Sequence, residues 1–349
     1  MDAPEIDNRT ELLVEPHQLL ACDGERLVTL IKGTFEQDGA GQLVEAPPER
    51  RRGIRFADSH WGDPETSAPA YPCDAVGFKP TTDVVVVAVA FAPEGEEVES
   101  FDVAVKVGPL DKSLRVFGLR VWQEGGAGLS APRPVGEQEI RYDHAWGGLD
   151  ASDLTAVLEE PRNPVGRGIV RDRDALTHAL APCIEDPGEL ISSVRTEPPP
   201  AGLGPLGPHW KPRRDYMGTF DEAWLRDQAP LLPVDHDDRA NQCGSPGLVS
   251  SAPLRGDETV ALMNLTPGGG LLEVALPGVQ PVVVHDEQGH EPVELRPHLD
   301  TIVIDTIEVA PPSRVTVELI WRTVTRYPRR MKDLQVLVTE AQRHGRSAK

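Results

Sequence analysis

The chain has 349 residues, of which 39% are hydrophobic, and a formal net charge of −21. This length suits one large β-rich domain or two domains. The negative charge argues against a general nucleic-acid binder and against a protein that lies on anionic membranes, because both need a cationic surface. Gly and Pro are frequent, at 32 and 34 residues, so we expect many turns and no long helices.

The cysteines and the N-terminal residues indicate a reducing compartment. The four cysteines lie far apart, without a Cys-x-x-Cys pair, a pattern that fits neither a zinc site nor a dense disulfide framework. The first residues are acidic, and no apolar segment of a signal peptide follows them. The longest apolar stretch, residues 84–92, is too short to span a bilayer. We therefore expect a cytoplasmic protein without a membrane segment.

The first half of the chain shows the residue patterns of short strands. Residues 27–35 form a strand candidate that ends at a Gly-rich turn signal. Residues 83–91 form a continuous β-branched run, which is typical of a strand buried on both faces. Val103, Val105 and Val107 alternate with other residues before a Gly-Pro turn, and we predict that the chain then pairs back as a hairpin.

β patterns return from residue 258 onward. Short apolar runs are separated by Gly, Pro or Asp turns, at residues 260–265, 271–276, 282–285 and 301–307. Val315, Val317, Leu319 and Trp321 alternate with Thr316, Glu318, Ile320 and Arg322, with a clean period of two. Together these patterns predict a mainly β protein, with β-sandwich or stacked-sheet architecture and long ordered loops.

One C-terminal α-helix is predicted in addition. Apolar residues recur at helical spacing on one face, at Met331, Leu334, Val338 and Ala341. The segment follows Pro328 and precedes Gly345, as helix start and stop signals do. Such a face either packs on the body or docks on a partner, and the sequence leaves both open.

The predicted organisation is a β-rich body over residues 1–325 and a basic helical tail over residues 326–349. The tail carries seven Lys and Arg against two Asp and Glu. Within the body, two lobes at about residues 1–160 and 250–325 are joined by a loop-rich segment, residues 161–249.

The loop-rich middle is the region in which we expect the function. It holds two Trp and several Gly and Pro turns, but little regular periodicity. A loop region this long inside a compact domain is functional or disordered, and disordered segments are poor in aromatic residues. We therefore expect an ordered surface, with one or two helical turns at residues 221–228, where Asp221 is a suitable cap and Trp224 can pack.

No catalytic or metal-binding motif stands out in the sequence. It has no nucleophile elbow, no His-Glu-x-x-His pair and no phosphate loop. The run Asp235-His236-Asp237-Asp238 has the residue types of a metal or acid–base site, but neighbours on an extended chain point in opposite directions. A solvated acidic turn is the simpler interpretation. We therefore expect no catalytic residue, no cofactor and no metal.

The Trp and Arg residues of this region are candidates for partner binding, because both types are enriched at interface hot spots. Gly and Pro hold loops in one shape, so ordering costs less on binding. The candidates are Trp146, Arg167, Trp210, Arg213, Trp224 and Asp235. The alternative is that the Trp rings fill the core under the loops and the Arg side chains bond to loop carbonyls. Both interpretations stay open.

Eight short motifs occur in a fixed order over most of the chain. They are Lys-x-Leu-x-Val-x-Gly-x-Arg-x-Trp from Lys112, Ala-Trp-Gly-Gly from Ala145, Asn-Pro-x-Gly-x-Gly from Asn163, Pro-Ala-Gly-x-Gly-Pro from Pro200, Trp-x-x-Arg from Trp210, Gly-Thr-x-Asp-x-x-Trp from Gly218, Leu-Pro-x-Asp from Leu232, and Trp-Arg from Trp321. No single motif is specific. In this order they resemble the bacterial family known as domain of unknown function 2169.

The resemblance implies a role without catalysis. Such proteins are typically encoded beside type VI secretion genes, near genes for spike-tip proteins and toxic effectors. They look like adaptor chaperones that hold an effector or its spike domain before loading. The resemblance thus implies a secreted effector toxin or a spike-tip protein as the partner, and the cytoplasm of a bacterium as the location.

One departure from the family pattern concerns the acidic run. The family's Asp-Phe-Asp turn reads Asp235-His236-Asp237 here, and the Arg-Phe that commonly follows reads Arg239-Ala240. An apolar position that would suit a partner contact is therefore polar in this chain.

Two other functions are compatible with the sequence. A hydrolase of carbohydrate or peptidoglycan needs two carboxylates that face each other across a cleft, and the 56 Asp and Glu are abundant enough to supply such a pair. A β-sandwich carbohydrate-binding module needs exposed, coplanar Trp rings, and the exposure of the six Trp decides that alternative.

Overall fold

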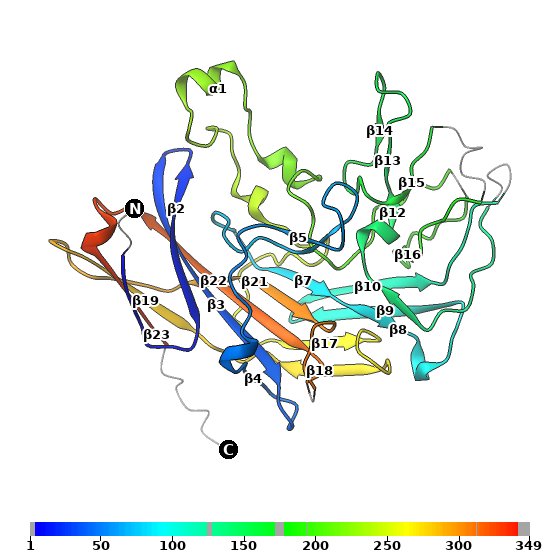
Figure 1. The fold of residues 1–349 in the computed structure, drawn as a ribbon, viewed down its shortest axis with the longest axis horizontal. Helices are drawn as coiled ribbons and strands as arrows, with labels where there is room; N and C mark the ends of the chain where they lie inside the picture. The colour runs from blue at the N-terminus through cyan, green and yellow to red at the C-terminus, as the bar shows by residue number, and fades with distance from the viewer. Residues whose placement is uncertain (1–3, 124–127, 172–177, 194, 312, 341–349) are drawn as a thin grey trace.

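A six-stranded β-sheet forms the centre of the protein (Figure 1). The computed structural model describes residues 4–340 apart from 124–127, 172–177, 194 and 312. Strand order in the central sheet is β2-β3-β22-β21-β7, and β4 pairs with β3. Its strands are β2 (Leu13–Ala21), β3 (Gly24–Gln37), β4 (Leu43–Glu45), β7 (Asp83–Val87), β21 (His298–Asp305) and β22 (Thr316–Arg326).

Two further sheets cover one face of the central sheet. The five-stranded sheet has the order β16-β10-β9-β17-β18, and the four-stranded sheet has the order β1-β23-β19-β20. Their strands are β1 (Glu5–Asn8), β9 (Ser100–Val107), β10 (Leu110–Phe117), β16 (Ile184–Glu185), β17 (Thr259–Met263), β18 (Leu271–Ala275), β19 (Pro281–Glu287), β20 (Val293–Leu295) and β23 (Leu334–Glu340). Buried apolar side chains of all three sheets form one continuous core, to which Phe35, Val105 and Val336 belong. The prediction of a mainly β, stacked-sheet protein is therefore confirmed.

Short elements make up the rest of the described chain. Its small paired strands are β5 (Ser59–His60), β6 (Pro69–Tyr71), β8 (Val89–Phe91), β11 (Glu137–Glu139), β12 (Trp146–Gly147), β13 (Leu149–Asp150), β14 (Leu158–Glu159) and β15 (Arg167–Gly168). Turns of 3-10 helix are η1 (Pro48–Arg50), η2 (Pro93–Gly95), η4 (Tyr142–His144), η6 (Arg213–Tyr216), η7 (Asp238–Asn241) and η8 (Met331–Asp333). The described residues form one α-helix, α1 (Glu222–Asp227), and none of their helices is long and apolar enough to cross a membrane.

Three local predictions agree with the fold. The alternating valines form the hairpin β9–β10, in which Val107 lies opposite Leu110. All five residues of β7 are buried, as expected for a strand that is covered on both faces. Helix α1 lies in the segment predicted to be helical, and the Asp221 carboxylate caps it by accepting from the backbone nitrogen of Trp224.

The predicted C-terminal helix is wrong in the part that the structure describes. Met331–Asp333 form one 3-10 turn, and Leu334–Glu340 form β23, which pairs with β1 and β19. Val336 and Val338 alternate with half-buried residues and belong to the core. Two neighbouring strands supply backbone hydrogen bonds and a buried face, which a lone short helix in water does not gain. Residues 341–349 lie outside the described part of the chain.

Strands from the two predicted lobes share the same sheets. β3 pairs with β22, β7 pairs with β21, and β9 pairs with β17. Strands from before residue 160 therefore lie beside strands from after residue 250, and one core serves both stretches. The intervening residues 161–249 form mainly loops above the sheets in Figure 1.

The second face of the central sheet carries buried charges. Alternation along β22 places Glu318 and Arg322 on the side opposite the apolar core. The Glu318 carboxylate lies 2.6 Å from Lys32 Nζ of β3, and both side chains are buried. Arg52 and Arg55, from the segment after η1, donate to the same carboxylate at 3.1 and 2.6 Å. We call this group of charges the Glu318 cluster.

The Glu318 cluster extends into the loop that covers this face. Asp74 accepts from Lys32 Nζ at 2.7 Å. Asp305 of β21 accepts from Arg52 at 2.6 Å and from the Tyr71 hydroxyl at 2.5 Å. The loop is thus fixed over the sheet by charge-assisted hydrogen bonds, which are stronger than neutral ones.

We expect Glu318→Gln to destabilise the protein strongly. Burial raises the pKa of Glu318, but Lys32 and Arg55 outweigh burial and lower it to about 2, so this carboxylate is charged at neutral pH. A neutral amide removes the carboxylate that Lys32, Arg52 and Arg55 share, so these cations keep only the other carboxylates of the cluster, Asp74 and Asp305. Breaking a buried ion pair in this way costs about 3–5 kcal/mol of unfolding free energy. Urea denaturation at neutral pH measures the loss.

Glu294→Gln is the matched control for this variant. Glu294 is exposed, and its ion pair with Arg296 lies at the surface, where such pairs contribute about 0–1 kcal/mol. Equal losses in the two variants would contradict the structural role of the Glu318 cluster.

Candidate interaction surface

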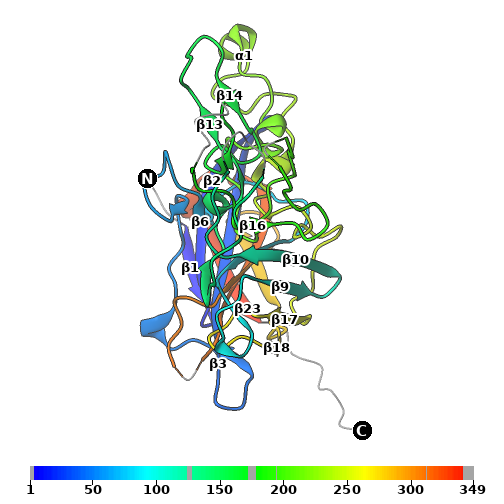
Figure 2. The same cartoon turned by 90° about the vertical axis from the view of Figure 1, so that its right-hand side faces the viewer.

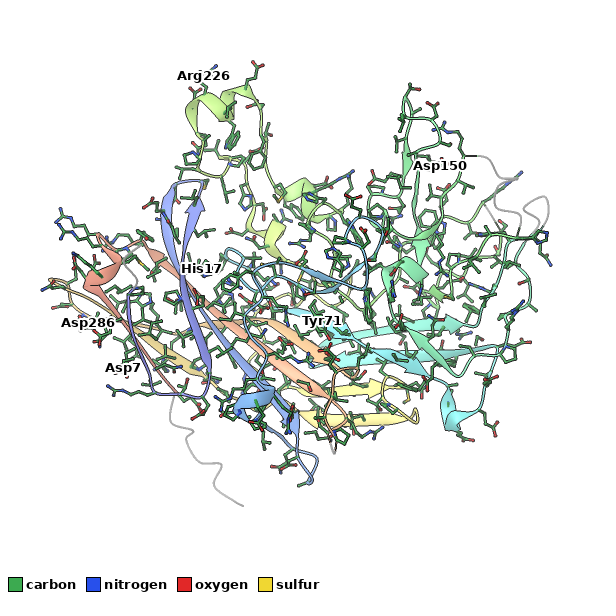
Figure 3. The ribbon with its side chains drawn as sticks, viewed as in Figure 1. Asp7, His17, Tyr71, Asp150, Arg226 and Asp286 are labelled. Carbon is green, nitrogen blue, oxygen red and sulfur yellow. The ribbon has the colours of Figure 1, made fainter. Side chains whose placement is uncertain are left out.

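Two arms project from the same side of the body (Figures 1 and 2). We call residues 149–160, with β13 and β14, the hairpin arm, and residues 218–238, with α1, the helical arm. The floor is the segment 56–71, which contains β5 and β6. In the view of Figure 3, Tyr71 of the floor lies between the labelled residues of the two arms. The arms and the floor together are the arm surface.

An interlocked turn holds the base of the hairpin arm. The buried Asn163 side chain donates from Nδ2 to the carbonyl oxygens of Tyr142 and Trp146, at 2.8 and 2.9 Å. Gly147 has a φ of 147°, and a Cβ there would lie 2.3 Å from the Asn163 carbonyl oxygen. A Cβ on Gly166 would lie 2.4 Å from Asn163 Nδ2. The Trp-Gly-Gly and Asn-Pro-x-Gly motifs therefore depend on each other to form this turn.

Hydrogen bonds within the helical arm fix its shape. Trp224 Nε1 donates to a backbone carbonyl of the arm at 2.9 Å. Asp235 accepts from the backbone nitrogen and Oγ1 of Thr219 at 2.9 and 2.7 Å, and these bonds lower the pKa of Asp235. Gln228 Nε2 donates to the Cys22 carbonyl at 2.6 Å, which ties the arm to the turn between β2 and β3. The arm is therefore ordered by its own contacts and by one link to the body.

Three hollows border the floor. The largest, of about 580 Å³, is lined in part by His60 and Trp210. A second, of about 550 Å³, also contacts His60 and is lined by Trp61 and Tyr71. A third, of about 270 Å³, contacts Phe56. The floor is thus bordered by recesses whose lining includes aromatic side chains.

Three polar side chains that line the second hollow, those of Arg52, Arg55 and Tyr71, are engaged in the fold. Arg52 and Arg55 donate to the Glu318 cluster. The Tyr71 hydroxyl donates to Asp305, and burial together with this carboxylate raises the pKa of Tyr71, so the hydroxyl stays protonated at neutral pH. Among the described residues, no group of three or more His, Cys, Asp or Glu is placed to hold a metal ion. The hollow therefore provides a recess of fixed shape with apolar lining, such as the Trp61 ring, for contact with a partner.

Three of the predicted partner-binding residues are buried. Trp146 packs in a small core with Trp122. Trp210 meets Tyr142 edge-on, with 5.5 Å between ring centroids. Arg213 donates to two loop carbonyl oxygens at 3.0 and 2.6 Å. These side chains hold the loops to the body, as one of the two interpretations of the sequence expects.

The other three predicted residues lie closer to solvent. Arg167 is half-buried at the base of the hairpin arm, opposite Trp146 in the β12–β15 pair. Trp224 is half-buried and Asp235 is exposed, and both belong to the helical arm. The six residues are thus spread over both arms and the loops between them. Their role in binding a partner stays a prediction.

The carboxylates of the acidic run have different partners. Asp235 closes the turn at Thr219, whereas Asp237 pairs with Arg239 at 2.6 Å. The hydrogen bond from Arg239 lowers the pKa of Asp237, and burial raises the pKa of Asp238. These groups act separately, as turn and helix-end residues of the helical arm.

The most exposed large apolar side chains lie on the arm surface. Among the described residues, the four highest exposed fractions belong to Leu154 (82%), Val234 (81%), Leu225 (67%) and Phe56 (66%). Leu154 is on the hairpin arm, Val234 and Leu225 are on the helical arm, and Phe56 is on the floor. Further exposed apolar residues of the arms are Leu149, Val157, Leu158 and Phe220. Sequence reasoning missed them because isolated apolar residues in loops have no period.

The arms, the floor and the middle strands of the central sheet fall within one family match. The model of a family described as an uncharacterized protein conserved in bacteria (DUF2169) matches residues 23–322. The chain belongs to this family. No curated protein and no solved structure matches the chain significantly. In this DUF2169 member, the motif residues Gly147, Asn163 and Gly166 are those that build the base of the hairpin arm.

We expect Asn163→Asp to loosen the base of the hairpin arm. An ionised carboxylate has the shape of the amide but cannot donate to the two carbonyls. The lost bonds and the buried charge cost about 3 kcal/mol or more. Thermal unfolding and hydrogen exchange of residues 145–168 measure the effect.

Gln288→Glu serves as the control, because it introduces the same charge at an exposed position. If the amides of residues 145–168 exchange as slowly in Asn163→Asp as in Gln288→Glu, then Asn163 does not hold the arm.

Proposed function

We propose that this DUF2169 protein is a non-enzymatic adaptor that binds another protein through the arm surface. The observation that carries the proposal is that the four most exposed large apolar side chains lie on the arms and the floor. Clustered exposed apolar residues are typical of interaction sites. Single exposed apolar residues scattered over a surface would not support it.

Preformed arms support the proposal further. Asn163 holds the hairpin arm, and Trp224, Asp235 and Gln228 hold the helical arm. A surface that is ordered before binding loses less conformational entropy when the partner arrives. The buried Trp146 and Trp210 then contribute by supporting the loops, and the exposed apolar residues make the contact.

The partner class comes from the motif resemblance. It implies that the partner is a secreted effector toxin or a spike-tip protein of a type VI secretion system, held in the cytoplasm before loading. The polar Asp235-His236-Asp237 run, where relatives carry Asp-Phe-Asp, changes the residues at the base of the helical arm. We therefore expect this chain to select its own partner within that class.

The alternative functions have weaker support. Four of the six Trp residues, which a carbohydrate-binding module would present to solvent, are buried. A hydrolase needs two carboxylates that face each other across a cleft, whereas the Arg and Tyr groups of one floor hollow are bonded to the Glu318 cluster and serve the fold. The adaptor proposal accounts for both observations without a free reactive group.

We expect the tagged protein to capture an effector or spike-tip protein from its own bacterium, identified by mass spectrometry. The double variant Leu154→Ser/Leu225→Ser removes one apolar contact from each arm, and we expect at least about a tenfold drop in capture. Leu271→Ser/Val293→Ser is the matched control, since both residues are exposed on strands outside the arm surface and capture should persist.

Two results would contradict the adaptor proposal. One is that no effector or spike component is captured and that effector levels stay unchanged when the gene is deleted. The other is that both double variants capture the partner as well as the wild-type protein does, which would place the contact away from the arms.

A further inference from the structure

The arm surface is acidic as well as apolar. The hairpin arm carries four Asp and Glu and no Lys or Arg, and the helical arm carries six Asp and Glu against one Arg. The floor adds three Asp and Glu and no Lys or Arg. Residues 281–340, by contrast, carry ten Asp and Glu and seven Lys and Arg. The excess of acidic over basic residues is therefore larger on the arm surface than in residues 281–340.

Several of these carboxylates accept hydrogen bonds from neutral groups, so no paired cation offsets their charge. Asp153 accepts from the backbone nitrogen and hydroxyl of Thr155, and Asp221 accepts from the backbone of Trp224. Hydrogen bonds of this kind favour the ionised form, and they lower the pKa of Asp153. Nearby cations neutralise only a minority of the described carboxylates of the arm surface, as in the pairs Glu160–Arg162, Asp227–Arg226 and Asp237–Arg239.

We infer that the segment bound by the arm surface is a cationic amphipathic polypeptide, with Lys or Arg beside large apolar side chains. This inference rests on the proposed function and names the chemistry of its partner. The exposed Leu and Phe side chains supply apolar contact, and the carboxylates beside them attract cations and repel acidic segments. A second copy of this chain, at a net charge of −21, presents the same acidic arms and is repelled.

The recesses of the floor suit side chains of such a segment. The hollow of about 580 Å³ is lined by Leu149, Trp210 and Glu65. An apolar side chain can enter between the first two residues while a neighbouring cation meets the carboxylate. Amphipathic helices bind in grooves by anchors of this kind, spaced three or four residues apart.

The test uses a labelled synthetic peptide of about 18 residues, made of Leu and Lys in amphipathic helical spacing. One comparison peptide has the same composition in scrambled order, and another has Glu in place of Lys. Fluorescence anisotropy measures binding to the full chain at about 50 and about 300 mM salt. We expect the Leu/Lys peptide to bind at least about tenfold more tightly than either comparison peptide, and less tightly at the higher salt concentration.

Matched variants distinguish the effect of the charges on the arm surface from the effect of the net charge of the whole chain. We expect Glu65→Gln/Asp153→Asn/Glu222→Gln and, separately, Leu154→Ser/Leu225→Ser to weaken binding at least about fivefold. Glu96→Gln/Glu273→Gln/Glu291→Gln removes the same number of charges from exposed positions elsewhere, and binding should change less than about twofold. Circular dichroism confirms that each variant is folded.

Three results would overturn the inference: equal loss in the two charge variants, equal binding of the scrambled peptide, or binding of the Glu peptide. If one of them occurs while capture of the native partner still depends on Leu154 and Leu225, the cationic chemistry is wrong and the adaptor function stands. If capture fails as well, the proposed function falls with it.

Discussion

The structure depends on a carboxylate buried in the middle of a β-sheet. Glu318 lies on the face of β22 that is opposite the apolar core, where Lys32 of the neighbouring strand β3 supplies one cation. A buried charge without enough partners costs several kcal/mol. Arg52 and Arg55 supply the remaining cations from a loop, so the loop must lie across the sheet. The loop that continues into the floor is thus held against the sheet by these ion pairs.

Buried polar contacts also anchor the segments from which the arms project. Asp83 at the start of β7 accepts from Lys79 Nζ at 2.9 Å and from the backbone nitrogen of Cys243 at 2.7 Å, which anchors the segment that follows the helical arm. Tyr142, at the base of the hairpin arm, shares a hydrogen bond of 2.7 Å with Ser245. A charge on the sheet therefore helps to hold the segment that follows the helical arm, although the two are far apart in sequence.

Periodicity predicted the strands whose own residue pattern identifies them without knowledge of the strands they pair with. The strands β7, β9 and β22 follow from their alternating or continuous apolar residues. The same reasoning failed at β23, because its apolar residues satisfy both a helical and a strand pattern and only the pairing with β1 and β19 decides. It also did not show that Glu318 is buried, since alternation along a strand does not tell whether a polar side chain contacts water or buried cations.

The candidate site was predicted only in part. Residue types drew attention to Trp146 and Trp210, which support the arms. They did not reveal Leu154 and Leu225, because the exposure of these side chains is visible only in the folded chain.

As an adaptor, the protein would contact its partner with both arms in the living bacterium. The most direct measurement is site-specific photo-crosslinking, with a photoreactive amino acid placed at Leu154, at Leu225 or, as the reference, at the exposed Leu271 of β18. The account predicts that both arm positions form an adduct with the same polypeptide, an effector or spike-tip protein, and that Leu271 does not. Adducts of equal yield at all three positions, or none at either arm, would contradict it.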